Sequence, residues 1–116
     1  MEKMAILVSS DLLLASQIDG DCRAVGLTLV TADASNCLDR AANAEWVFWD
    51  LQAAMPSSDV VEQFHAQVGC RIIALGPHVD EERLQSARDA GCDLVLPRGQ
   101  FVRELSQILR NDQHGS

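Results

Sequence analysis

Long apolar runs are absent from this sequence. The longest uninterrupted ones are Met4 to Val8 and Leu12 to Ala15, whereas a membrane-spanning helix needs roughly 18 to 20 apolar residues. The N-terminal run is too short for a secretory signal peptide, and Asp11 follows it too soon. The sequence therefore predicts neither a transmembrane helix nor a leader, and we expect a cytoplasmic protein.

Positive charge is also scarce. Nine Lys and Arg residues stand against 17 Asp and Glu residues, which gives a net charge of −8, and Lys3 is the one lysine. A chain with this charge repels phosphate backbones and anionic lipid. Direct binding to nucleic acid or to a membrane surface is therefore not expected.

The sequence lacks the short motifs of common enzymes. It has no Gly-x-Gly-x-x-Gly, no Walker A sequence, no His-Glu-x-x-His and no Gly-x-Ser-x-Gly. Its cysteines form no Cys-x-x-Cys pair, which predicts reduced and mostly buried thiols. These cysteines are Cys22, Cys37, Cys70 and Cys92. We expect a protein that is not an enzyme and has no cofactor, Mg²⁺ being the one candidate considered below.

What the sequence does contain is a repeated alternation of short apolar runs with amphipathic stretches. The runs are apolar at consecutive positions, as expected for strands that are covered on both faces of a parallel sheet. The predicted strands are Met4 to Val8, Leu27 to Thr31, Trp46 to Trp49, Arg71 to Leu75, and Leu94 to Leu96. Trp46 and Trp49 are accordingly expected in the core.

Helix signals occupy the segments between these strands. Asp11 stands at the N-cap position of the first helix, and Gly26 follows its end. The predicted helices are Asp11 to Val25, Ala32 to Ala42, Pro56 to Val68 before Gly69, Val79 to Ala90 before Gly91, and Phe101 to Leu109. The pattern is weakest in the second. Residues Asn111 to Ser116 are polar and are predicted to form a disordered tail.

Five βα units in a chain of this length match a flavodoxin-like doubly wound α/β domain. We predict one (βα)₅ domain over residues 1–110, with a five-stranded parallel sheet in the order 2-1-3-4-5. In this order the crevice lies beyond the carboxyl ends of the first and third strands. Ser9, Ser10 and Asp11 follow the first strand and Asp50 follows the third, so these side chains are expected to meet there.

The acids at this crevice allow three interpretations. Asp11 and Asp50 could hold Mg²⁺ with the Ser10 hydroxyl nearby, and Asp50 could then accept a phosphoryl group. Against this, the chain has no lysine after Lys3 to neutralise the transferring oxygens. In the second interpretation, Asp11 only caps a helix and Asp50 is a solvated acid at a strand end. The third is a pocket for a small ligand or a partner.

Three segments carry a resemblance to a known family: Ala5 to Asp11 (AILVSSD), Trp46 to Leu51 (WVFWDL) and Leu84 to Pro97 (LQSARDAGCDLVLP). They resemble the receiver domain of bacterial response regulators, and the resemblance extends from about residue 3 to residue 110. It implies that Asp50 is the phosphoacceptor position. It also implies that Ser10 and Asp11 take the place of a carboxylate pair, of which one acid is missing.

The chain departs from the receiver pattern at two further positions. The resemblance places a Thr or Ser at the end of the fourth strand, but Gly76 stands there and has no side chain to bond a phosphoryl oxygen. The lysine position falls on Pro97 or Arg98, of which only Arg98 offers a cation. The sequence is therefore most similar to an atypical receiver, or pseudo-receiver. That resemblance implies a non-catalytic signal-transduction module that acts by protein–protein interaction.

The resemblance also implies a partner surface on the fourth helix, fifth strand and fifth helix. The residues expected there are Arg88, Arg98, Arg103 and Glu104. The partners would be signalling proteins, such as a histidine kinase or an output protein, or a second copy in a homodimer. Two alternatives stay open. One is a phosphorelay receiver that is phosphorylated on Asp50 with Mg²⁺, and the other is a redox or small-ligand sensor, which would need a thiol of lowered pKa.

Leu12 and Leu13 are apolar beyond what the inner face of the first helix needs. Packing inside the protein is the favoured prediction for both. A plug in the crevice and a partner surface are the alternatives.

Overall fold

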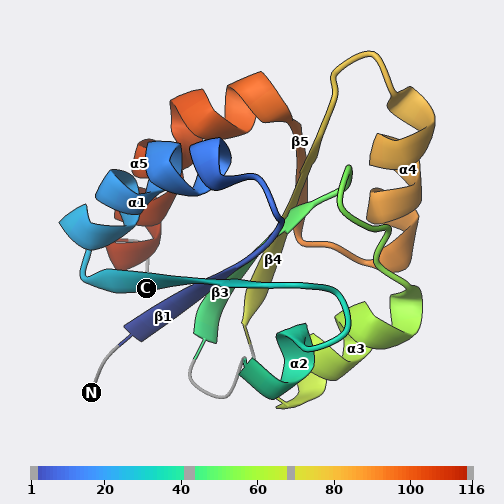
Figure 1. Cartoon of the computed structure of the whole chain (residues 1–116), viewed down its shortest axis with the longest axis horizontal. Coiled ribbons are helices and arrows are strands. Elements are labelled where there is room, and N and C mark those ends of the chain that lie inside the picture. The colour runs from blue at the N-terminus through green and yellow to red at the C-terminus, as the bar shows by residue number, and fades with distance from the viewer. Residues whose placement is uncertain (1–2, 41–43, 68–69, 115–116) are drawn as a thin grey trace.

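The computed structural model describes residues 3–40, 44–67 and 70–114. The described residues form a five-stranded parallel sheet in the order β2-β1-β3-β4-β5. Helices α1 and α5 cover one face of the sheet, and α2, α3 and α4 cover the other (Figure 1). The predicted α/β architecture and strand order are confirmed.

The strands are β1 (Lys3–Val8), β2 (Leu27–Ala32), β3 (Ala44–Asp50), β4 (Arg71–Gly76) and β5 (Leu94–Pro97). The helices are α1 (Leu12–Ala24), α2 (Cys37–Arg40), α3 (Ser58–Gln67), α4 (Glu81–Ala90) and α5 (Arg98–His114). Each strand overlaps its predicted run and extends it by one to three residues. Within the described residues, no helix is long and apolar enough to cross a membrane.

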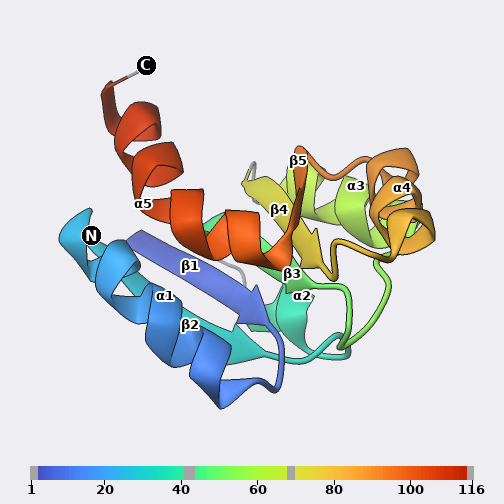
Figure 2. The ribbon, with the colours of Figure 1, turned by 90° about the horizontal axis from the view of Figure 1, so that it is seen from above.

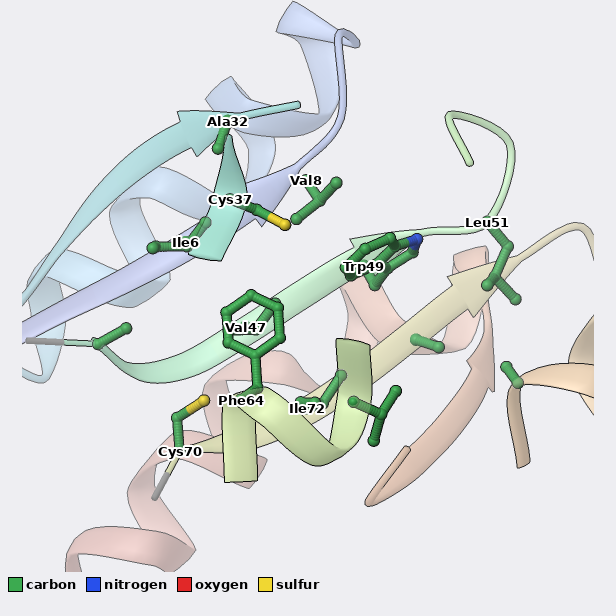
Figure 3. Close-up of a cluster of buried hydrophobic side chains, with 14 of the residues drawn as sticks. Ile6, Val8, Ala32, Cys37, Val47, Trp49, Leu51, Phe64, Cys70 and Ile72 are labelled. Atoms are coloured by element: carbon green, nitrogen blue, oxygen red, sulfur yellow. The ribbon is translucent and has the colours of Figure 1, made fainter. Parts of the chain in front are cut away.

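Alternate residues of each central strand enter different hydrophobic layers, because successive side chains of a strand point to opposite faces. Ala5 of β1 belongs to the layer below α1 and α5, whereas its neighbour Ile6 belongs to the layer below α2, α3 and α4. Figure 3 shows this second layer, where Trp49 lies edge-on to Phe64 of α3. Trp46 and Trp49 are both buried, on opposite faces, as predicted for core residues.

Two helices begin at aspartate caps and end near glycine. Asp11 caps α1 by accepting hydrogen bonds from the backbone N–H groups of the first turn, and Asp80 caps α4 in the same way. Gly91 at the end of α4 has φ +103°, a left-handed conformation that favours glycine. The helix begins at Glu81, two residues after the predicted start at about Val79. Val79 lies before the cap and is 79% exposed.

The second helix is much shorter than predicted. Ala32 belongs to β2, and Asp33 then closes a turn by accepting hydrogen bonds from the N–H groups of Ser35 and Asn36. Because this turn uses the first residues of the predicted helix, α2 keeps only Cys37–Arg40. The predicted end at Ala42 lies outside the described residues.

The ends of two other helices were also predicted differently. Helix α3 is described from Ser58 to Gln67, and the predicted end at Val68 and Gly69 lies outside the described residues. Helix α5 begins at Arg98, directly after β5, and continues to His114 (Figure 2). The segment predicted as a polar tail from Asn111 is therefore helical through His114.

Candidate functional site

Asp50 ends β3 at the carboxyl edge of the sheet, in the crevice that the strand order predicts. Its side chain is buried, and the residue is only 4% exposed. The Ser9 hydroxyl donates a 2.7 Å hydrogen bond to Asp50 Oδ2, and the Gln52 N–H donates a 3.0 Å hydrogen bond to Oδ1. Both carboxylate oxygens of Asp50 therefore have partners from this chain itself.

Of the two serines expected near Asp50, Ser9 contacts it, whereas Ser10, which the resemblance places in the acidic pocket, is not the donor. Ser9 continues the course of β1, since its N–H donates to the Ala32 carbonyl at 3.3 Å, as a β1–β2 ladder bond would. Ser9 is buried and Ser10 is exposed. The Ser9 Oγ also accepts a hydrogen bond from the Asp11 N–H at 3.1 Å. The apolar run ends at Val8, and this pattern gave no signal that the strand direction persists for one more residue.

Asp11 has two tasks that use both of its carboxylate oxygens. Oδ1 accepts hydrogen bonds from the N–H groups of Leu13 and Leu14 and so caps α1. Oδ2 accepts a 2.5 Å hydrogen bond from Arg98 Nη2 in an ion pair. The Arg98 guanidinium, together with the Leu14 and Leu13 N–H groups, lowers the pKa of Asp11 below its ordinary value. Asp11 is therefore a carboxylate that is already paired at neutral pH.

Arg98 thus occupies the crevice and does not belong to an open surface. It is the first residue of α5, and its side chain is 28% exposed. The sequence offered Arg98 both as the crevice cation and as a residue of the partner surface, and in the structure it turns toward Asp11. The other predicted surface residues differ from it: Arg88 and Arg103 are exposed, and Glu104 is half-buried.

These donors do not fit a divalent cation. Mg²⁺ takes about six oxygen ligands in near-octahedral geometry, usually with one or two free carboxylates. Here a metal would compete with Arg98 for Asp11 Oδ2, and it would share Asp50 with the Ser9 and Gln52 donors. Within the described part of the chain, no group of three or more His, Cys, Asp or Glu side chains could hold a metal ion.

Gly76 ends β4, where the resemblance places a switch hydroxyl. Its neighbour in the β4–β5 register is Pro97. A Cβ on Gly76 would lie 3.2 Å from Leu51 Cδ1 and 3.6 Å from Leu84 Cδ2. The space beside Gly76 is therefore filled by aliphatic carbon, and Leu51 is completely buried there (Figure 3).

A polar hollow lies on the β2 side of Ser9, with a volume of about 250 Å³. Its lining residues are Ser9, Thr31, Ala32, Asp33, Asn36 and Arg40. Arg40 Nη1 donates a 2.9 Å hydrogen bond to the Thr31 carbonyl, so part of its donor capacity is already used. The hollow is the place where a small-ligand interpretation would have to be tested.

Leu12 and Leu13 stand at the mouth of the crevice and face outward. They are 80% and 67% exposed, respectively, whereas Leu14, the next residue, is fully buried. The favoured prediction that both leucines pack inside the protein was wrong, and neither is buried as a plug. Met55 and Val79, in the loops after β3 and β4, are exposed as well. The carboxyl edge of the sheet therefore carries exposed apolar side chains on two of its loops and on the first turn of α1.

The cysteine thiols have raised pKa values, whereas reactive thiols have lowered ones. All four are free, and three are buried while Cys92 is half-buried. Burial raises the pKa of Cys22 to about 12 and the pKa values of Cys70 and Cys92 to about 11. It raises the pKa of Cys37 as well. A redox sensor needs a lowered thiol pKa, so these thiols do not fit that alternative.

No family model and no curated protein sequence matches this chain. Solved structures do. The receiver domain of AraT, a response regulator from Geobacillus stearothermophilus, is similar with a TM-score of 0.72 and 14% identity, over 99% of this chain and 98% of that one. The receiver domain of a Saccharomyces cerevisiae response regulator, crystallised with a histidine phosphotransfer signaling protein, gives a TM-score of 0.74 and 15% identity, over 95% and 88%.

A third similar structure is a response regulator protein from Burkholderia pseudomallei with a phosphorylated aspartic acid, a calcium ion and citrate. Its TM-score is 0.68 at 14% identity, over 97% of this chain and 73% of that one. At these identities the likeness concerns the fold. It spans nearly the whole of this chain, in agreement with the strand order and the two helical layers.

Proposed function

This chain has the fold of response-regulator receiver domains, and we propose that it is an atypical receiver. In this proposal it is a non-catalytic signal-transduction module that acts by binding other proteins, and Asp50 is not phosphorylated. Fold alone does not determine function. The proposal therefore depends on the side chains at the crevice.

The observation that carries the proposal is that every carboxylate oxygen of Asp11 and Asp50 already has a hydrogen-bond donor from the chain itself. Phosphoryl transfer to an aspartate needs a divalent cation and a free carboxylate oxygen to attack the donor. Asp50 gives one oxygen to the Ser9 hydroxyl and the other to the Gln52 N–H, and Arg98 is paired with Asp11. The Asp11–Arg98 pair is partly exposed, so it contributes little to stability. In the proposal its importance is that Arg98 supplies the positive charge beside Asp11 that a metal would otherwise supply.

The end of β4 supports the same conclusion. A hydroxyl at that position would be needed to bond a new phosphoryl group and carry the signal onward. Gly76 has no side chain, and Leu51 fills the adjacent space. Phosphorylation of Asp50 would therefore have no side chain at Gly76 through which to act.

We place the partner surface on α4, β5 and α5. Arg88 and Arg103 are exposed there, Glu104 is half-buried, and Leu94 of β5 is 38% exposed. The yeast neighbour was crystallised with a phosphotransfer protein, which supports a protein partner for this fold. The candidate partners are a histidine kinase, an output protein or a second copy of this chain. The four free cysteines fit a reducing compartment such as the cytoplasm.

The test is intact-mass measurement of the protein with Mg²⁺ and acetyl phosphate, together with amide NMR spectra before and after adding beryllofluoride. We expect no mass increase and no shift of the Asp50, Leu51 or Gln52 signals. The control is Asp50→Asn, which removes the only acceptor that the resemblance indicates. A gain of one phosphoryl group that Asp50→Asn abolishes would contradict the proposal and establish the phosphorelay alternative.

A further inference from the structure

We infer that Leu51 and Arg83 latch α4 to the turn that follows Asp50, so that the exposed face of α4 is held in one position. The role of these contacts in partner binding rests on the proposed function, since α4 belongs to the proposed partner surface. The inference goes further by identifying which contacts present that surface. The contacts themselves are observed independently of any partner.

The first part of the latch is apolar. Leu51 directly follows Asp50, is completely buried, and donates its N–H to the Leu75 carbonyl at 2.9 Å. The absence of a side chain at Gly76 makes room for Leu51, since a Cβ there would lie 3.2 Å from Leu51 Cδ1. The same Cβ position lies 3.6 Å from Leu84 of α4. Leu51 and Leu84 therefore both border the space over Gly76 and belong to one hydrophobic cluster, through which α4 packs near the β3 turn.

The second part of the latch is polar. Arg83 of α4 donates from Nη1 to the Leu51 carbonyl at 2.5 Å, and its Nε lies 3.1 Å from Asp80 Oδ2. Asp80 is the N-cap of α4, and its Oδ1 accepts the Arg83 N–H. The guanidinium is thus oriented by the helix cap and bonds the backbone of the turn. A charged donor on a carbonyl oxygen is stronger than a neutral hydrogen bond.

The turn that receives these contacts is itself held at every residue. The Gln52 N–H bonds the Asp50 carboxylate, and the N–H groups of Ala53 and Ala54 bond the Asp50 carbonyl at 3.0 and 3.4 Å. The Ala54 carbonyl accepts from Trp49 Nε1 at 2.8 Å. The turn is therefore a firm attachment point, and a helix fastened to it cannot shift without breaking the contacts of Leu51 and Arg83.

The consequence for regulation is that α4 needs no event at Asp50 to reach its binding position. The turn between them is already closed by Ser9, Gln52 and Arg83 in the unmodified protein. The partner surface would be presented constitutively. Control of binding would then lie in the partner or in the amount of this protein.

The experiment is amide hydrogen exchange of the full chain, followed by NMR, in Arg83→Met and Arg88→Met. Both residues are exposed arginines of α4, and both variants lose one charge. Within the described residues, however, the hydrogen bond of the Arg88 side chain goes to Gln85 of the same helix, at 3.3 Å. We expect the Leu51, Gln52 and Ala53 amides to exchange about tenfold faster in Arg83→Met than in Arg88→Met. Equal exchange rates in the two variants would overturn the inference.

Further variants distinguish the effect of the Leu51 and Arg83 contacts from the effect of the Arg83–Asp80 ion pair and from general unfolding. Asp80→Asn keeps a good N-cap residue but removes the charge beside Arg83, and we expect exchange of the turn within about twofold of wild type. Gly76→Ala places a Cβ against Leu51 Cδ1 and should speed amide exchange in the turn. Adding Leu51→Val removes that Cδ1, and the double variant should return to the slow exchange of the wild type. Failure of this rescue would count against the latch.

The latch and the proposed function can fail separately. Exchange is measured on the isolated protein, so a latch that is absent leaves the partner question open. Phosphorylation of Asp50 in the wild type would contradict the proposed function whatever the exchange rates. Exchange that is slow in every variant would contradict the latch alone.

Discussion

Among the individual side chains, Ser9 is the one whose role the structure changes most. It is buried, and its hydroxyl is the hydrogen-bond donor to the buried Oδ2 of Asp50. Removing one partner of a buried pair leaves the other unsatisfied, which costs about 1–3 kcal/mol and more when that group is charged. The neighbouring Ser10 is exposed and provides a matched comparison.

We therefore expect Ser9→Ala to lower the free energy of unfolding by about 1–3 kcal/mol, whereas Ser10→Ala should change it by less than about 0.5 kcal/mol. Urea unfolding at neutral pH, followed by tryptophan fluorescence, measures both. A Ser9→Ala protein as stable as Ser10→Ala would mean that Asp50 finds another donor. It would contradict the importance assigned to the hydrogen bond between Ser9 and Asp50.

The same residues mark how far the sequence could predict the site. The place of Asp50 follows from the strand order, since an acid after the third run must lie at the carboxyl edge next to the first. The N-cap role of Asp11 follows from its position before a helical pattern. The resemblance pointed to Arg98 as the crevice cation, but the sequence did not identify Asp11 as its partner. A pairing of this kind depends on how closely β5 brings the start of α5 to β1.

Among the helices, the first turn of α1 has both exposed and buried leucine side chains. Leu12 and Leu13 are exposed, and Leu14 is fully buried beside β1. The periodicity placed Leu14 on the inner face and left Leu12 and Leu13 outside it, and the separate prediction that these two pack inside was the one that failed. Three consecutive residues on a helix cannot all point into the core, since residues on the same face are three or four positions apart.

For this element we expect the double variant Leu12→Lys, Leu13→Lys to keep its free energy of unfolding within about 0.5 kcal/mol of wild type, since exposed substitutions change it little. Leu14→Ala, on the same turn, should lower it by about 2–5 kcal/mol, because it removes a buried side chain and leaves a cavity. Thermal and urea unfolding report both effects. A large loss in the double variant would show that the outer leucines are covered in solution, by a second copy or by another segment.

Across the whole molecule, the sequence predicted the layers well because the strands are apolar at consecutive positions. This pattern requires cover on both faces, and it leaves few ways to order the strands. The lengths of the helices were harder to predict, because local turn chemistry decides them. Asp33 ends the predicted second helix early by closing a turn, and Asp80 delays the fourth by acting as its cap.

The four thiols are spread over both hydrophobic layers, and they report on the folded molecule as a whole. Their raised pKa values mean that the folded chain keeps protons that the unfolded chain releases near the ordinary thiol value of 9.0. The contribution of the protonated thiols to the free energy of unfolding is therefore complete below about pH 9, and it declines as the pH rises toward 11. The free energy of unfolding should therefore fall across this range.

At pH 8 we expect the folded protein to react with a disulfide reagent at least about 100-fold more slowly than the protein in urea, since the thiolate is the attacking species. The reaction rate of Cys92 tests this prediction most directly. This thiol is only half-buried, so its slow reaction depends on its raised pKa of about 11 more than on shielding from the reagent. Cys92→Ser should leave the slow rate unchanged. Rapid modification that disappears in Cys92→Ser would reveal a reactive thiol at the end of α4 and would restore the redox-sensor alternative.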